Sequence, residues 1–258
     1  MVTGGSRGIG KGIALELAKA GANVVITYVE RAAQAEQTLA EIDALGVSCA
    51  AYQCDVSQPE AVATTVASAA SAFDGLDILV HNAAVQGPLC HVADTSAADM
   101  HNVMDVNFFG AFYLTQAAIP HMRRAPRGDF IFISTSGTKH RREIALPYLV
   151  AKSAVESMAK HLAVGLAQWG IRVNVVAPSL VDTEMTRDSL REVSANAASG
   201  EGAPGSVGRE YLRPASEFPF GRILRPEDVG KACVFFCSED AEYVNGQLLY
   251  LDGGADWT

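Results

Sequence analysis

The sequence predicts an α/β protein of the doubly wound type, with helices on both faces of a parallel sheet. Short apolar runs alternate with longer segments of helical period along most of the chain, which is the pattern of βαβ units. A glycine-rich segment, Gly4 to Gly10, lies directly before the first helical segment. The 258 residues are 49% hydrophobic and 19% charged, an ordinary globular balance, so we expect one domain over residues 1–258.

Six strands are expected after a short stub at the amino terminus. Each is a run rich in Val, Ile, Ala, Leu or aromatic side chains, most of which favour strands. In chain order the runs are Asn23–Tyr28, Cys49–Cys54, Leu76–His81, Asp129–Ser134, Arg172–Ala177 and Gln247–Leu251. With the stub, the sheet would be seven-stranded. Only Met1 and Val2 precede the motif Thr3–Gly10, where a buried strand needs roughly 5 residues, so the first strand is expected to be truncated.

Helices are expected between these strands, because apolar residues recur there at helical spacing. They are Lys11–Ala20, Ala32–Leu45, Gln58–Phe73, Asp99–Met122, Tyr148–Gln168 and Pro226–Cys237. The segment Thr186–Ser216 is rich in Gly, Ser, Ala and Arg and carries no strong period. A long irregular segment inside a compact domain is typically a lid or a mobile loop, so we expect a substrate loop near residues 186–216.

Composition excludes several classes of function. A net charge of −9 argues against a nucleic-acid-binding protein, which needs a clustered basic face. The chain has no apolar run of about 18 residues and no charged leader before an apolar stretch, so neither a membrane span nor a signal peptide is expected. The 5 cysteines lack metal-ligand spacing. They are expected to be buried thiols of a cytoplasmic protein, and no metal site is predicted.

The glycine-rich segment predicts a dinucleotide site. Gly4, Gly8 and Gly10 lie where a strand turns sharply into a helix. Without Cβ atoms, the backbone can approach a pyrophosphate and direct helix amino-terminal N–H groups at it. Taken alone, the same glycines would also fit a tight turn with no ligand.

Tyr148 and Lys152 lie four residues apart on an expected helix and should share one face. A phenol is a poor acid at neutral pH, but a nearby ammonium favours the phenolate and lowers its pKa. The pair therefore predicts proton chemistry. An ordinary pair of surface side chains is the alternative.

Together the motifs resemble those of the short-chain dehydrogenase/reductase family. Thr3-Gly4-Gly5-Ser6-Arg7-Gly8-Ile9-Gly10, His81-Asn82-Ala83-Ala84, Tyr148 with Lys152, and Asp252-Gly253-Gly254 follow the family order TGxxxGxG, NNAG, YxxxK and DGG over almost the whole chain. The resemblance implies a Rossmann-type seven-stranded sheet and hydride transfer between a nicotinamide cofactor and a ketone, aldehyde or alcohol. It also implies cofactor contacts at Gly4, Ser6, Arg7, Gly8, Ile9, Gly10, Tyr28, Arg31, Asp55, Val56, Asn82, Ala83, Ala84, Tyr148, Lys152, Pro178, Val181 and Thr183.

Some of these contacts have implied partners. Asp55 would accept from the adenine amino group, Asn82–Ala84 would pass under the ribose, and Thr183 would bind the nicotinamide carboxamide. Ala84 stands where the family has glycine, so its methyl group would crowd the cofactor if the residue needs a positive φ. His81, at the end of a buried strand, is expected to be a core histidine with hydrogen-bond partners.

The residue at the end of the second strand distinguishes NADP(H) from NAD(H). A carboxylate there would accept from the adenine ribose and repel a 2′-phosphate, but the residue is Tyr28. Arg7 and Arg31 can pair with the phosphate, so NADP(H) is predicted. If both arginines are solvated and Glu30 reaches the ribose, the chain is an NAD(H)-dependent alcohol dehydrogenase.

The resemblance assigns the chemistry to Asn107, Thr135, Tyr148 and Lys152. Tyr148 would exchange a proton with the substrate oxygen, Lys152 would lower its pKa and bind the nicotinamide ribose, and Asn107 would hold a water at a break in helical bonding. The hydroxyl that binds the substrate oxygen is normally a serine thirteen residues before the tyrosine, a spacing that leads to Thr135. Ser134 and Ser136 remain open, because a slip of one residue would exchange them.

Assembly and substrate are less constrained. A homotetramer is expected, since Phe108, Phe109, Phe112, Tyr113, Met158, Leu162 and Leu166 form apolar stripes on two helices that pack between subunits in this family. Arg187, Arg191 and Arg209 would meet an anionic substrate, or else are solvated. The substitution at Thr135 and the truncated strand also leave a non-catalytic nucleotide-binding regulator open.

Overall fold

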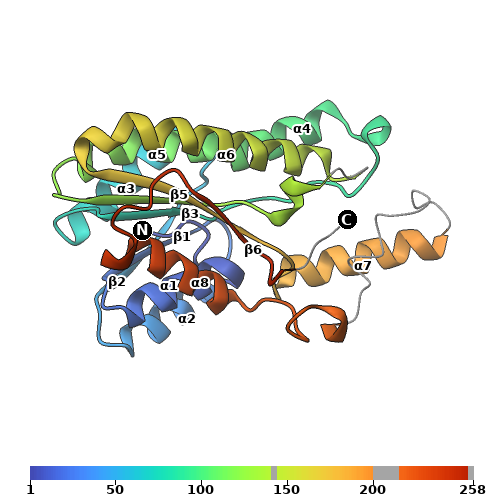
Figure 1. The fold of residues 1–258 in the computed structure, drawn as a ribbon, viewed down its shortest axis with the longest axis horizontal. Coiled ribbons are helices and arrows are strands. Elements are labelled where there is room, and N and C mark those ends of the chain that lie inside the picture. The colour runs from blue at the N-terminus through green and yellow to red at the C-terminus, as the bar shows by residue number, and fades with distance from the viewer. Residues whose placement is uncertain (141–143, 200–214, 255–258) are drawn as a thin grey trace.

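Helices cover both faces of a parallel sheet in the computed structural model of the protein, which describes residues 1–140, 144–199 and 215–254 (Figure 1). The strands are β1 Val24–Tyr28, β2 Cys49–Gln53, β3 Ile78–His81, β4 Gly128–Ile133, β5 Ile171–Pro178 and β6 Leu248–Leu251. β1 pairs with β2, and β3, β4, β5 and β6 pair in that order. All these pairings are parallel.

Val2 connects the two groups of strands. It forms parallel bridges to Ile26 in β1 and to Val80 in β3 and is fully buried. The expected count of seven strands is not confirmed, because the described residues contain six strands and the amino-terminal segment contributes bridges at one residue. The sheet is continuous through that residue.

Two helical layers enclose the sheet. Three helices cover one face: α1 Gly8–Lys19, α2 Ala32–Asp43 and α8 Pro226–Cys237 (Figure 1). The other face is covered by α3 Pro59–Ala72, α4 Ala97–Met104, α5 Gly110–Met122 and α6 Leu146–Leu166. Successive side chains of a strand point to opposite faces of the sheet. In β4, Phe130 and Phe132 face the layer that contains α5 and α6, whereas Ile131 and Ile133 face the layer of α1, α2 and α8. None of the described helices has the length and apolar character needed to cross a membrane.

Several short helical turns complete the described chain. The 3₁₀ turns are Val92–Asp94, Ser136–Lys139, Ala167–Trp169, Ala215–Glu217 and Glu239–Ala241. A π turn at Asp105–Phe109 separates α4 from α5, where one helix, Asp99–Met122, was expected. The amide of Gly110 donates to the carbonyl of Asp105, five residues earlier. The break in helical bonding expected at Asn107 is therefore present.

The expectation of an irregular segment at Thr186–Ser216 is wrong for its first half. Helix α7 spans Glu184–Ser199, and residues 200–214 lie outside the described part of the chain. Thr183 Oγ1 accepts a hydrogen bond from the amide of Thr186 at 3.2 Å, which caps the helix start. Glu184 adds a negative charge in the first turn, where it is favourable. These local signals start the helix although the segment is polar on average.

Candidate active site

A cavity of about 570 Å³ lies at the carboxyl ends of the strands. Its lining comes from the glycine loop, from segments that follow β1 to β5, from α6 and from α7. It contains every predicted cofactor and catalytic residue except Gly10 and Asn107. The lining also contains residues that were not predicted as site residues, and Glu184, Met185, Thr186 and Ser189 are among them because α7 was not expected.

The glycine loop requires glycines for steric reasons. Gly4 and Gly8 have φ values of +63° and +53°, in the left-handed region that disfavours a side chain. A Cβ on Gly10 would lie 2.2 Å from the Gly4 carbonyl oxygen, so this residue serves close packing behind the cavity. Helix α1 starts at Gly8 with no side-chain cap and no acidic residue in its first turn. The first amides of a helix have no acceptor within the helix and suit a pyrophosphate, so the loop fits a dinucleotide.

Hydrogen bonds join the glycine loop to the segment after β3. Thr3 Oγ1 accepts from the amides of Asn82 and Ala83, both at 3.0 Å. Asn82 Nδ2 donates to the Thr3 carbonyl at 2.9 Å. Among the described residues, positive φ outside glycine occurs at Asp74 and Ala145, so Ala84 does not meet the crowding considered for it.

His81 is a core histidine with partners, as expected. Its ring is fully buried, with Nδ1 3.4 Å from Thr3 Oγ1 and Nε2 3.3 Å from the Asn107 carbonyl oxygen. Burial lowers the pKa of His81 to about 3, and the positive charge of Lys152 acts in the same direction. A neutral imidazole that already has two partners is poorly placed to act as a general base.

Tyr148 and Lys152 face the cavity from the first turns of α6. Lys152 is 1% exposed, and its Nζ donates to the Ile133 carbonyl at 2.8 Å and lies 5.7 Å from the centre of the Tyr148 ring. Burial lowers the pKa of Lys152 to about 8, an effect that the Glu156 carboxylate partly opposes. Tyr148 and Lys152 therefore share one wall of the cavity, and the Ile133 carbonyl holds the Lys152 ammonium in place.

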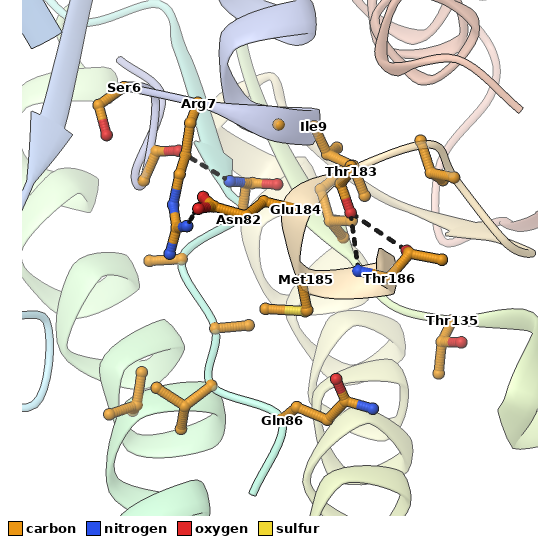
Figure 2. A pocket seen from close by; sticks show the side chains of 18 of the residues that line it. Ser6, Arg7, Ile9, Asn82, Gln86, Thr135, Thr183, Glu184, Met185 and Thr186 are labelled. Atoms are coloured by element: carbon orange, nitrogen blue, oxygen red, sulfur yellow. Dashed lines mark hydrogen bonds and ion pairs between the residues drawn. The ribbon is translucent and has the colours of Figure 1, made fainter. Parts of the chain in front are cut away.

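The three candidate hydroxyls differ in their surroundings. Ser134 also lines the cavity, but its Oγ donates to Glu156 Oε1 at 2.5 Å, so its proton is already engaged. Thr135 Oγ1 accepts from the Gly137 amide at 3.2 Å and lines the cavity (Figure 2). Ser136 is 3% exposed and is not part of the lining. Thr135 is thus the hydroxyl whose proton is available to a ligand.

Asn107 is buried behind the cavity, within the π turn. Its side-chain amide exchanges two hydrogen bonds of 2.9 Å with the backbone of Val85. Residue 110 must be glycine beside this turn, because a Cβ there would lie 2.8 Å from Val56 Cγ2. Asn107 therefore positions the segment after β3 and does not itself reach the cavity surface.

The two arginines predicted to bind a phosphate converge at one end of the cavity. Arg7 and Arg31 both form ion pairs with Glu184, the first residue of α7, and Figure 2 shows Glu184 directed at Arg7. Tyr28 and Glu30 line the same region. The arginines in α7 behave differently: Arg187 pairs with Asp182 at 2.8 Å and Arg191 with Asp188 at 2.9 Å. Arg209 lies outside the described residues.

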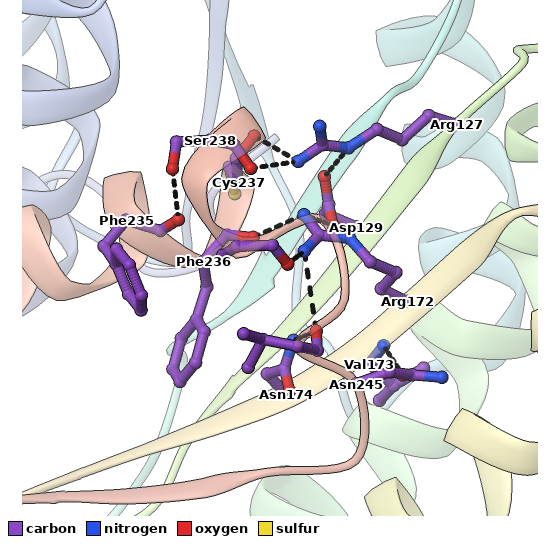
Figure 3. A network of polar contacts seen from close by, with 12 residues as sticks. Arg127, Asp129, Arg172, Val173, Asn174, Phe235, Phe236, Cys237, Ser238 and Asn245 are labelled. Atoms are coloured by element: carbon purple, nitrogen blue, oxygen red, sulfur yellow. Dashed lines mark hydrogen bonds and ion pairs between the residues drawn. The ribbon is translucent and has the colours of Figure 1, made fainter.

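A second cluster of charged residues lies at the amino-terminal edge of the sheet and is structural (Figure 3). Arg172 is paired with Asp129 at 2.6 Å, and Arg127 donates to the carbonyls of Cys237 and Ser238 at 2.6 and 2.8 Å. These carbonyls end α8, where a positive charge is favourable. Burial raises the pKa of Asp129 and both guanidinium groups oppose the shift. The cluster fixes α8, which packs on α1 behind the glycine loop.

The chain is similar to known oxidoreductases over almost its whole length. The family described as enoyl-(acyl carrier protein) reductase matches residues 4–256. An NADPH-dependent aldehyde reductase-like protein of Arabidopsis thaliana is 34% identical over 98% of this chain and 92% of its own length. An L-rhamnose 1-dehydrogenase (NAD(P)(+)) of Sphingomonas is 32% identical over 98% of this chain and 94% of its own. A short-chain dehydrogenase of Burkholderia cenocepacia, solved with NADP, is 31% identical with a TM-score of 0.81, over 98% and 96% of the two chains.

Proposed function

The chain belongs to the short-chain dehydrogenase/reductase family of oxidoreductases, and we propose that it interconverts a ketone or aldehyde and an alcohol with NADP(H). The observation that carries this proposal is the Tyr148–Lys152 pair on the wall of the cavity that also holds the glycine loop. The bound nicotinamide would supply or accept the hydride. The protein's own groups would bind, orient and move the proton.

Tyr148 is the acid in reduction and the base in oxidation. Its hydroxyl would give a proton to the carbonyl oxygen as negative charge develops there. Lys152 supports this step, because its ammonium stabilises the phenolate that remains. Thr135 would donate a second hydrogen bond to the same oxygen, since its own oxygen already accepts from Gly137. Asn107 would orient the loop at Val85 beside the substrate.

Preference for NADP(H) is supported by the charges around the adenine end. Tyr28 provides no carboxylate at the end of β1, while Arg7 and Arg31 lie beside it in the lining. Two guanidinium groups, each from the residue before a helix, suit the three oxygens of a 2′-phosphate. The names of the Arabidopsis and Burkholderia proteins, with NADPH and NADP respectively, agree with this choice.

The substrate is proposed to be a neutral carbonyl compound. The cationic side chains in the described lining are Arg7, Arg31 and Lys152, at the adenine end and behind Tyr148. Arg187 and Arg191 are held by carboxylates of their own segment. Neutral lining residues from the segment after β3 and from α7 include Val85, Gln86, Met185, Thr186 and Ser189.

A single set of measurements tests the function. The purified protein is titrated with NADPH and NADH by fluorescence, and NADPH oxidation is followed with a panel of neutral and charged aldehydes and ketones. We expect tighter NADPH binding and turnover with neutral members of the panel. Arg7→Ala should remove most of the cofactor preference. Binding without turnover across the panel would indicate the non-catalytic regulator, and a preference for NADH would reject the NADP(H) assignment.

A further inference from the structure

Glu184 contacts the two arginines on which the proposed cofactor preference depends. We propose that Glu184 is an internal competitor of the 2′-phosphate, held by Arg7 and Arg31 until NADP(H) displaces it, and that it thereby sets the selectivity between NADP(H) and NAD(H). This inference rests on the proposed use of NADP(H). It adds a residue of α7 to the groups that determine cofactor choice.

The three side chains come from distant parts of the chain. Arg7 precedes α1, Arg31 precedes α2, and Glu184 opens α7, 177 residues after Arg7. Arg7 Nη1 bonds Glu184 Oε2, and Arg31 Nη1 lies 3.4 Å from Glu184 Oε1, so each carboxylate oxygen has its own guanidinium. Hydrogen bonding to Arg7 holds the pKa of Glu184 below its usual value. The carboxylate is therefore charged, and it occupies the arginine donors at neutral pH.

A phosphate monoester should displace this carboxylate. It carries a charge of about −1.5 to −2 at pH 7 and three acceptor oxygens, against one charge and two oxygens for Glu184. The two ion pairs of Glu184 are easily opened, because the side chains of Arg7, Arg31 and Glu184 are 46%, 45% and 44% exposed. A 2′-phosphate beside Glu184 would also be repelled while the carboxylate remained. NAD(H) has no such phosphate and would leave the ion pairs intact.

The exchange also acts on α7. Glu184 follows Thr183, whose hydroxyl caps this helix, and one turn later Ser189 Oγ donates to Gln86 Oε1 at 2.6 Å across the cavity wall. Opening the pairs at Glu184 removes one of the contacts that hold the first turn of α7 against the cofactor site. Binding of the phosphate and the position of α7 are then coupled, and the coupling acts equally in both directions.

Binding titrations separate this competitor from other roles. Wild type, Glu184→Gln and Asp188→Asn are titrated with NADPH, NADH and 2′-AMP. Asp188 is the control because it loses the same charge from α7 but pairs with Arg191. We expect Glu184→Gln to bind NADPH and 2′-AMP about three- to tenfold more tightly, with NADH and the Asp188→Asn protein close to wild type.

Three outcomes would overturn the inference. Glu184→Gln would show unchanged or weaker NADPH binding, equal tightening of NADPH and NADH, or the same change as Asp188→Asn. In each of these cases the role of Glu184 is rejected. The use of NADP(H) would still be supported if Arg7→Ala lost its preference for NADPH. If wild type binds NADH as tightly as NADPH and Arg7→Ala changes neither, the proposed cofactor fails and the competitor with it. Since Glu184 is half exposed, the variant should keep the wild-type Tm, which a melting curve checks.

Discussion

Thr135→Val removes one hydroxyl from the cavity wall while keeping the branched shape of the side chain. The Gly137 amide donates to Thr135 Oγ1, so the hydroxyl proton is free for the substrate oxygen. Losing one donor to a developing negative charge typically costs about 10² to 10³ in kcat. The Gly137 amide also loses its acceptor, which should cost about 1 kcal/mol of stability and roughly 2 °C in Tm. Rates at saturating NADPH measure the first effect and a thermal melt measures the second.

The flanking serines provide matched controls for this experiment. Thr135→Ser keeps the donor and should retain or exceed wild-type kcat. Ser136→Ala removes a hydroxyl outside the lining and should change kcat little. Ser134→Ala removes the hydrogen bond to Glu156 but no donor to the substrate, so it should lower kcat less than Thr135→Val does. A rate collapse in Ser134→Ala or Ser136→Ala, with Thr135→Val near normal, would show that the wrong hydroxyl has been assigned.

Three further predictions concern proton transfer, pH and assembly. Tyr148→Phe should lower kcat by ~10² or more with NADPH affinity nearly intact, because it deletes the acid and leaves the nucleotide contacts; near-normal turnover would reject Tyr148. Burial lowers the pKa of Lys152 to about 8, so its ammonium is lost as pH rises through 8 and reductive kcat should fall above that pH. Glu156 raises the pKa of Lys152, so Glu156→Gln should move the fall of kcat at high pH to a lower pH. If this fall does not move, its assignment to Lys152 is contradicted. Phe109 in the π turn before α5, Phe112 in α5 and Val164 in α6 are 40%, 45% and 82% exposed. Light scattering should therefore show a homotetramer that Phe112→Asp weakens, and a monomeric wild type at micromolar concentration would exclude it.

The sequence predicts the strands to within a few residues because each is a short, mainly apolar run between segments of helical period. The expected Arg172–Ala177, for example, is Ile171–Pro178, buried throughout. Helix α7 was not predicted, because its polar composition hides the period and its start depends on a cap at Thr183. The ion pair of Glu184 with Arg7 was also not predictable, since no local pattern links residues 177 positions apart. Motif spacing leads to Thr135, whereas the difference in hydrogen bonding between Thr135 and Ser134 is visible only with Glu156 in place.

The π turn between α4 and α5 has a consequence for how this segment tolerates insertions and deletions. A π turn contains one residue more than an α turn, and each helical residue corresponds to about 100° of rotation. Deleting one residue from Asp105–Phe109 would restore regular α bonding, but it would rotate α4 relative to α5 by about that angle. Asn107 would then turn away from Val85, which it now holds by two hydrogen bonds. A substitution in this segment can preserve the relative orientation of α4 and α5, whereas an insertion or deletion changes it.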